Sequence, residues 1–174
     1  MIKVINNFLP TIFFKKLNTI INDSNFQWYF NESNLKPNQP GYKKGKYYFT
    51  HNIYDENIGK MSEVFNVFEP ILYFIDQKSK VNKLLKIKLN LYPNQNKKIY
   101  QAKHCDMVDQ LNKPLTNSYT GILNFTTCNG GTKIDKKEYS SKQNEFIYFE
   151  NNISHAGIVQ TDTTIRIVLN INWL

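Results

Sequence analysis

Hydrophobic residues recur every three or four positions in two stretches of the first half of the chain, residues 9–21 and 61–75. This spacing predicts two amphipathic helices, each with one face turned toward a core. Pro10 falls in the first turn of the first helix, where proline is tolerated, whereas Pro70 is expected to kink or divide the second. The first face comprises Leu9, Phe13, Leu17, Ile20 and Ile21, and the second comprises Met61, Val64, Phe65, Phe68, Ile71, Leu72 and Ile75.

Stretches rich in aromatic and β-branched residues indicate strands, and most of them follow residue 80. They are residues 25–30 and 47–54 in the first half, and 84–92, 119–126, 145–149 and 164–174 in the second. The segment Asn129-Gly130-Gly131 predicts a hairpin-type turn after one of these strands. We therefore expect an α+β, mainly β fold in a single domain, 1–174. Its helical and irregular part, 1–80, would support a sandwich or barrel-like core, 81–174.

Residues 31–46 contain a dense group of prolines and glycines, including Pro37, Pro40 and Gly41, together with several lysines. Such a composition is typical of a loop. Because breakers and lysines are concentrated here, between flanking aromatic residues, we hypothesise that residues 31–50 form a lid over a substrate. The alternative is that these aromatic side chains are simply buried in the core.

Composition narrows the class of protein. Hydrophobic residues make up 41% of the 174 residues, which is typical of a folded domain, and no apolar run approaches the roughly 18 residues that span a bilayer. We read no cleavable leader at the N-terminus, so we expect a cytoplasmic protein whose Cys105 and Cys128 are reduced packing residues. The net charge of +8 leaves a nucleic-acid partner open, although dispersed lysines are more typical of a solvated surface.

The candidate chemistry centres on two of the three histidines. In an extended segment, His104 and Asp106 project from the same face while Cys105 points away. His155 follows a predicted strand and is the strongest candidate for a third ligand. Two histidines and one carboxylate leave coordination positions open, as in non-heme Fe(II) oxygenases, whereas a structural zinc site is more often closed by four protein ligands. The remaining histidine, His51, is expected to be structural or to lie at the rim of a pocket.

Arginine occurs once, at Arg166, although the chain contains 22 basic residues. Its planar guanidinium can bind a carboxylate through two parallel hydrogen bonds, which an ammonium group cannot do. A solitary arginine is only suggestive when taken alone.

The order His104-x-Asp106, His155 and Arg166 resembles the signature of the Fe(II)- and 2-oxoglutarate-dependent oxygenases. The stretches ILNFTTCNGGT and NEFIYFENNISHAG are also similar to this family, and the likeness runs from about residue 84 to the C-terminus. It is closest to small prolyl-hydroxylase-like members, including those carried by bacteria and phages. The resemblance implies a double-stranded β-helix, that is, a jelly-roll or cupin-like core with the N-terminal helices packed on it. A phage-encoded member would act in the host cytoplasm.

The resemblance also implies cofactors. His104, Asp106 and His155 would bind Fe(II), and Arg166 would bind the far carboxylate of 2-oxoglutarate, the co-substrate that is consumed together with O2. Ascorbate is a further candidate cofactor.

The remaining contacts to 2-oxoglutarate are assigned by the same resemblance. Asn90 and Tyr92 match the Asn-x-Tyr pair that some branches of the family use, and Tyr119 is a looser alternative. Some members carry a hydroxyl two residues after the arginine, where this chain has Val168. Either Tyr92 or Tyr119 would then supply that hydrogen bond, or the pocket is less polar.

The first functional hypothesis from this resemblance is hydroxylation of a prolyl or similar side chain in a protein or peptide. Oxidation of a nucleobase, as in nucleic-acid demethylases, is an alternative that the positive charge and the Asn-x-Tyr pair keep open. A third possibility is a cupin-like module that binds metal without turnover. No membrane partner is expected, and the sequence does not indicate an oligomeric state.

Overall fold

The structure is a computed structural model that describes residues 1–33, 42 and 45–174. Its elements follow the chain in the order β1 (Ile2–Ile5), α1 (Thr11–Ile21), β2 (Tyr29–Asn31), β3 (Tyr48–Asp55), β4 (Gly59–Lys60), α2 (Phe65–Phe68), α3 (Ile71–Asp76), β5 (Leu84–Pro93), β6 (Tyr119–Asn124), β7 (Cys128–Ile134), β8 (Lys137–Ser141), β9 (Phe146–Glu150), β10 (His155–Ile158) and β11 (Ile165–Trp173). None of the described helices is long and apolar enough to cross a membrane.

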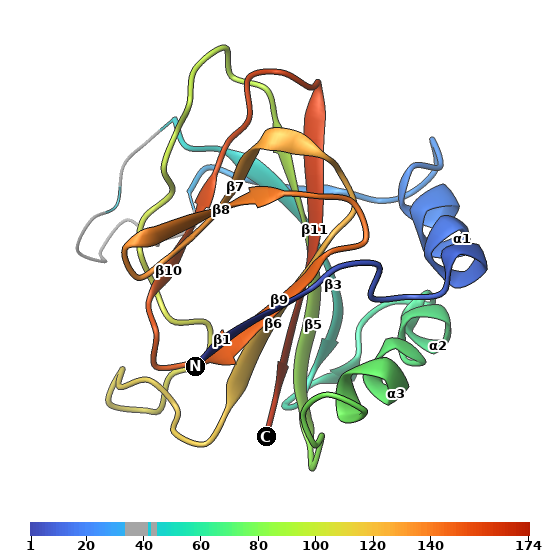
Figure 1. Ribbon diagram of the computed structural model, residues 1–174, viewed down its shortest axis with the longest axis vertical. Helices are drawn as coiled ribbons and strands as arrows, with labels where there is room; N and C mark the ends of the chain where they lie inside the picture. Colours follow the sequence, from blue (N-terminus) through green and yellow to red (C-terminus); the bar gives the residue numbers. More distant parts are fainter. Residues whose placement is uncertain (34–41, 43–44) are drawn as a thin grey trace.

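The strands form two antiparallel sheets (Figure 1). The larger sheet has the order β1-β9-β6-β11-β5-β3-β2, with β4 paired to β3, and the smaller sheet has the order β10-β7-β8. Side chains from both sheets meet in one hydrophobic cluster, which includes Ile122 of β6 and Ile134 of β7. Two facing antiparallel sheets with a shared interior make a jelly roll, so the predicted mainly β core is confirmed.

Two neighbouring strands of the larger sheet, β5 and β11, have residues of different character on their two faces. Successive side chains of a strand point to opposite faces of the sheet. Leu89 and Leu169 are paired on the outer face and belong to the core cluster that also contains the helices. Asn90 and Asn170 lie on the inner face and line a pocket. The helices cover the outer face (Figure 1) and contribute Phe14, Leu17, Ile21, Phe65, Phe68, Ile71 and Ile75 to its core. The outer face is therefore covered by the hydrophobic core, and the polar side chains of these two strands lie on the inner face.

The predicted helices are present with small differences in extent. α1 begins directly after Pro10, and Pro70 separates α2 from α3. This division follows from the missing N–H of proline, which cannot continue the hydrogen bonding of the preceding helix. The strand predicted over 25–30 is confined to β2 at Tyr29–Asn31.

The predicted turn at Gly130 and Gly131 is wrong, because both residues lie inside β7. The chain reverses between β7 and β8 near Asp135, which has a positive φ of 52°. The two glycines instead permit neighbouring backbones to approach closely at a bulge in the β7–β8 pairing. A Cβ atom at Gly131 would lie 2.0 Å from the carbonyl oxygen of Tyr139, and one at Gly130 would lie 2.8 Å from that of Ile158.

The larger sheet extends further into the first 80 residues than the sequence pattern indicates. β1 pairs with β9, and β3 pairs with β5, so both ends of this sheet come from the N-terminal part. Residues 34–41 and 43–44, which belong to the predicted loop over 31–46 and to the predicted lid over 31–50, lie outside the described residues. Residues 48–50 of the predicted lid belong to β3. The lid therefore stays a prediction.

Candidate metal centre

A pair of backbone hydrogen bonds brings the two candidate histidines together. The His104 N–H donates to the His155 carbonyl oxygen at 3.0 Å, and the His155 N–H donates to the His104 carbonyl oxygen at 2.9 Å. This reciprocal bridge holds the segment before Asp106 against the first residue of β10. The two imidazole rings consequently lie side by side, with their centroids 4.6 Å apart. Residues 51 positions apart in sequence become direct neighbours.

Asp106 completes the predicted triad. Its Oδ1 lies 3.4 Å from Nε2 of His104 and 3.6 Å from Nε2 of His155. One donor atom from each of the three side chains lies within 4.8 Å of the others. The structure thus brings together the three residues that the sequence proposes as metal ligands, on the inner side of the jelly roll.

The charge states of these side chains suit a divalent cation. Burial raises the pKa of Asp106, but His155 and His104 outweigh it and hold that pKa well below its ordinary value. Burial lowers the pKa of His155 to about 4, because the opposing pull of Asp106 offsets only part of it. Near pH 7 the carboxylate is ionised and the His155 ring is neutral, which are the forms that bind metal.

His104 is oriented by its own backbone. Its Nδ1 lies 3.1 Å from the carbonyl oxygen of Ala102, and because a carbonyl only accepts, Nδ1 must carry a proton. Nε2 then faces Asp106 and is the nitrogen available to a metal. Burial lowers the pKa of His104, but the hydrogen bond to Asp106 and its charge raise that pKa more, so the net shift is upward. A divalent cation at this point would take the place of the proton on Nε2.

Two asparagines that the sequence does not single out hold Asp106 and its loop. Asn172 of β11 donates from Nδ2 to Asp106 Oδ2 at 3.2 Å and to Thr120 Oγ1 at 3.0 Å. The buried Asn151 accepts from the Met107 N–H at 3.0 Å and donates to the Met107 carbonyl oxygen at 2.7 Å. Asn172 shares the inner face with Asn170, and this alternation along β11 is the signal that could have identified it.

We expect Asn172→Ala to weaken Mn²⁺ binding about 10-fold or more, because partners that orient a metal ligand contribute about 10–100-fold to affinity. The Kd for Mn²⁺ measured by calorimetry checks this. Asn52→Ala, an exposed asparagine on β3, is the control and should leave the Kd unchanged. Equal Kd values for wild type and Asn172→Ala would remove Asn172 from a role in orienting Asp106.

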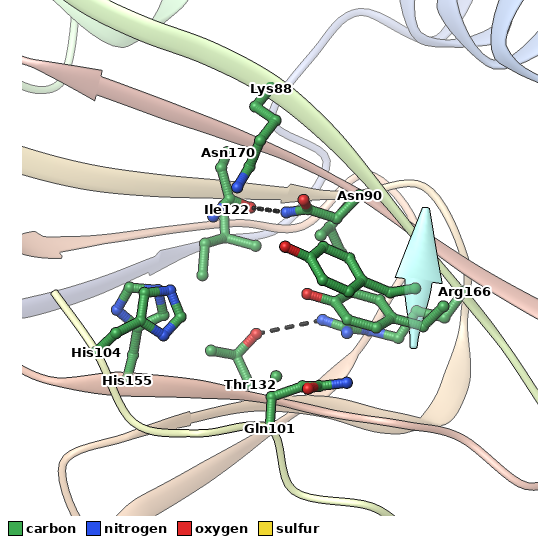
Figure 2. Close-up of a pocket in the computed structure, with 13 residues that line it drawn as sticks. Lys88, Asn90, Gln101, His104, Ile122, Thr132, His155, Arg166 and Asn170 are labelled. Atoms are coloured by element: carbon green, nitrogen blue, oxygen red, sulfur yellow. Dashed lines mark hydrogen bonds between the residues drawn. The ribbon is translucent and has the colours of Figure 1, made fainter. Parts of the chain in front are cut away.

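A pocket on the inner face runs from the triad to the single arginine. Figure 2 shows His104 and His155 at one end of the group and Arg166 at the other. Ile122 and Val168 give the wall an apolar part. The pocket volume is about 30 Å³, which is space for about two water molecules. Entry of a larger ligand therefore requires lining side chains to move.

Arg166 is fully buried without a carboxylate partner in the part of the chain that the structure describes. Its Nη2 donates to Thr132 Oγ1 at 3.2 Å, and its guanidinium carbon lies 5.2 Å from the centroid of the Tyr92 ring. Nε and Nη1 have no hydrogen-bond partner among the described residues. A buried cation with two free donors is costly by itself, and an anionic ligand would offset that cost. This observation fits the predicted contact with the far carboxylate of 2-oxoglutarate.

Of the other residues predicted to contact the co-substrate, two line the pocket and one does not. Asn90 and Tyr92 line the pocket, and Gly157 leaves room there, since a Cβ on it would lie 3.1 Å from the Tyr92 hydroxyl oxygen. Tyr119 is not among the lining residues, because its ring stacks on Trp173 at 5.5 Å in the other core cluster. This position does not favour Tyr119 as a contact of 2-oxoglutarate, and the assignment stays a prediction.

A hydroxyl that the sequence did not indicate lies next to the arginine. Val168 lines the pocket without a hydroxyl, and Thr132 of β7 places a hydroxyl against Arg166. Tyr92, which also lines the pocket, stays the predicted hydroxyl for the carboxylate. The expectation of a turn at the adjacent glycines concealed that Thr132 lies on a strand facing the pocket. Other lining residues missed by the sequence are Tyr48, Lys88 and Gln101.

His51 lies away from this pocket and has a structural role. Its Nδ1 lies 2.8 Å from the Gln27 carbonyl oxygen and its Nε2 lies 2.7 Å from Ser62 Oγ. Both ring nitrogens are thus engaged, and burial lowers its pKa, so the ring is neutral near pH 7. Cys105 is partly buried and Cys128 is buried, and both are free thiols.

The sequence matches no protein-family model and no curated protein. The fold, however, is shared with solved structures. An oxidoreductase of the 2OG-Fe(II) oxygenase family from Burkholderia pseudomallei aligns with a TM-score of 0.72 and 6% identity, over 99% of this chain and 84% of that one.

Two further structures are described as prolyl hydroxylases. A Trichoplax adhaerens prolyl hydroxylase in complex with a peptide fragment of the hypoxia inducible factor oxygen degradation domain has a TM-score of 0.65 and 14% identity, over 99% of this chain and 83% of that one. A viral collagen prolyl hydroxylase from Paramecium Bursaria Chlorella virus-1, in complex with 2OG, has a TM-score of 0.56 and 15% identity, over 99% of this chain and 94% of that one. The chain thus has the jelly-roll fold of 2-oxoglutarate-dependent Fe(II) oxygenases, and its chemistry has to be derived from its own site.

Proposed function

We propose that this protein is an Fe(II)- and 2-oxoglutarate-dependent oxygenase that hydroxylates its substrate. The observation that carries the proposal is the pairing of two features in one pocket, a His-Asp-His donor set and a buried arginine with two free donors. A metal site alone would suit a binding module. A co-substrate that binds both the metal and Arg166 also requires the second feature, a site for an anion in the same pocket.

Each residue has a distinct part in this proposal. His104, Asp106 and His155 would hold the ion, and three protein ligands would leave it able to bind further ligands. Arg166, which donates to Thr132, would bind the distal carboxylate of 2-oxoglutarate and so help to orient the co-substrate in the pocket. The apolar lining at Ile122 and Val168 limits access of water. When bound, Fe(II) supplies the redox chemistry by which O2 converts 2-oxoglutarate to succinate and CO2 and one oxygen atom enters the substrate.

The proposed substrate is a prolyl or similar side chain of a protein or peptide. Two of the structural neighbours are described as prolyl hydroxylases, one of them bound to a peptide, and this supports the choice. Nucleobase oxidation is the alternative. The presence of both Asn90 and Tyr92 in the pocket supports it, because these residues form the Asn-x-Tyr pair on which that alternative is based.

The proposal is tested by incubating the full chain with Fe(II), 2-oxoglutarate, O2 and ascorbate as reductant, and by measuring succinate. We expect succinate that depends on both Fe(II) and O2, with more formed when a substrate is present. A mass gain of 16 daltons in a prolyl peptide, or loss of a methyl group from an oligonucleotide, separates the two substrate classes. Metal binding with no succinate under any condition would instead indicate a non-catalytic module.

A further inference from the structure

A lysine lies on the inner face of β5, in the wall of the same pocket. Lys88 is paired with Asn170 of β11 and with Asn52 of β3, so its strand is flanked on both sides. Along β5, Tyr92 lies opposite Arg166, and Asn90 and then Lys88 follow at intervals of two residues. Lys88 is therefore displaced from the arginine end of the pocket. Figure 2 shows its amino group turned inward, near Asn170.

The ammonium group of Lys88 makes no hydrogen bond or ion pair with the described residues. Burial lowers its pKa, Asp106 raises it and Lys86 lowers it, so Asp106 is the acidic group whose field reaches it. Asp106, however, is already engaged by His104, His155 and Asn172. Lys88 is half-buried, and an ammonium group that is partly removed from water without a partner is unfavourable.

The charges in the pocket do not balance once the proposed cofactors are counted. A ferrous ion, Arg166 and Lys88 contribute positive charge, and Asp106 contributes one negative charge. 2-Oxoglutarate is a dianion, and its two carboxylates are taken by the metal and Arg166. One positive charge, that of Lys88, is left over in the wall of the pocket that the two histidines also line. A group of opposite charge on the primary substrate would neutralise it.

We propose that Lys88 binds a carboxylate of the primary substrate, so that this site selects a target that is a free carboxylic acid or that has an acidic residue next to it in a peptide. The inference rests on the proposed function and narrows its substrate class. Arg166 and Lys88 then divide the anions between them: Arg166 receives the co-substrate and Lys88 receives the substrate. A lysine suits the second task, since a flexible point charge tolerates more than one carboxylate geometry.

The test measures binding to the full chain loaded with Mn²⁺ and 2-oxoglutarate in the absence of O2. Calorimetry compares two matched pairs of probes, N-acetylproline with its amide, and acetylated, amidated Glu-Pro with Gln-Pro. Within each pair the members differ chiefly by one negative charge. We expect the acid of at least one pair to bind about tenfold or more tightly than its neutral partner, as a charge-assisted hydrogen bond predicts. The responding pair distinguishes a free acid from an acidic peptide.

Three variants assign that preference to Lys88. Lys88→Met keeps an unbranched stem and should reduce the acid preference to within about twofold, whereas Lys88→Arg should retain it. Lys86→Met is the matched control, because Lys86 lies on the same face of β5 and is not among the lining residues. It should behave as wild type.

The outcomes separate this inference from the proposed function. If the Mn²⁺-loaded wild type fails to bind 2-oxoglutarate, the proposed function fails and the inference fails with it. If 2-oxoglutarate binds but no acid binds more tightly than its neutral partner, only the role of Lys88 is overturned. The same holds if the acid preference survives Lys88→Met.

Discussion

Asp106→Ala should abolish turnover of 2-oxoglutarate and weaken metal binding by at least about a hundredfold, more than is expected for a residue that only orients a ligand. Asp106 is the one carboxylate that the described residues bring to the two histidines. Its removal leaves His104, His155 and the nearby Lys88 around the site, so the local charge becomes unfavourable for a cation. The measurements are the Kd for Mn²⁺ by calorimetry and the rate of succinate formation with Fe(II).

Asp109→Ala is the matched control for this prediction. Asp109 lies in the same loop, but its carboxylate accepts hydrogen bonds from the Leu111 and Lys113 N–H groups within that loop. We expect it to bind metal as wild type does. Circular dichroism should show that Asp106→Ala remains folded. A folded Asp106→Ala protein with wild-type metal affinity and turnover would contradict the assignment of the metal ligands.

The second large effect is expected at Arg166. Arg166→Lys should raise the Kd for 2-oxoglutarate by about 10–100-fold, because a point charge replaces a planar group that offers two parallel hydrogen bonds. In wild type, Nη2 is used by Thr132, and Nε and Nη1 are free among the described residues. The affinity for Mn²⁺ alone should be unchanged, since Arg166 lies at the opposite end of the pocket from the histidines (Figure 2).

Calorimetry of the Mn²⁺-loaded protein with 2-oxoglutarate measures this change directly. Thr132→Ser keeps the hydroxyl that contacts Arg166 and serves as the control, with an expected Kd close to that of wild type. If Arg166→Lys binds 2-oxoglutarate as tightly as wild type, the arginine does not receive its distal carboxylate.

The histidines and the arginine of the candidate site were predictable because histidine and arginine are rare residue types in this chain. Three histidines and one arginine leave few combinations, and the spacing of His104 and Asp106 places both on one face of an extended segment. The sequence could not reveal the reciprocal backbone bridge between His104 and His155, which depends on pairing between distant segments. The donor set was therefore predictable, and the means of assembling it was not.

The missed residues are polar side chains of common types on strands. Asn172 and Lys88 are distinguished from other asparagines and lysines only by pointing to the inner face, and that requires the register of β5 and β11. The sequence does not reveal the position of Thr132, because adjacent glycines are compatible with both a turn and a close approach of two backbones. The sequence does not indicate β1, because four residues are too few to show an alternation of hydrophobic and polar positions. Its pairing partner, β9, also lies far along the chain.

The most direct test of the proposed site is a crystal structure of the full chain grown with Mn²⁺ and 2-oxoglutarate in the absence of O2. The predicted result is one ion bound by His104, Asp106 and His155, with 2-oxoglutarate extending from that ion to Arg166. Ion density away from these three side chains, or 2-oxoglutarate bound without contact to Arg166, would contradict it.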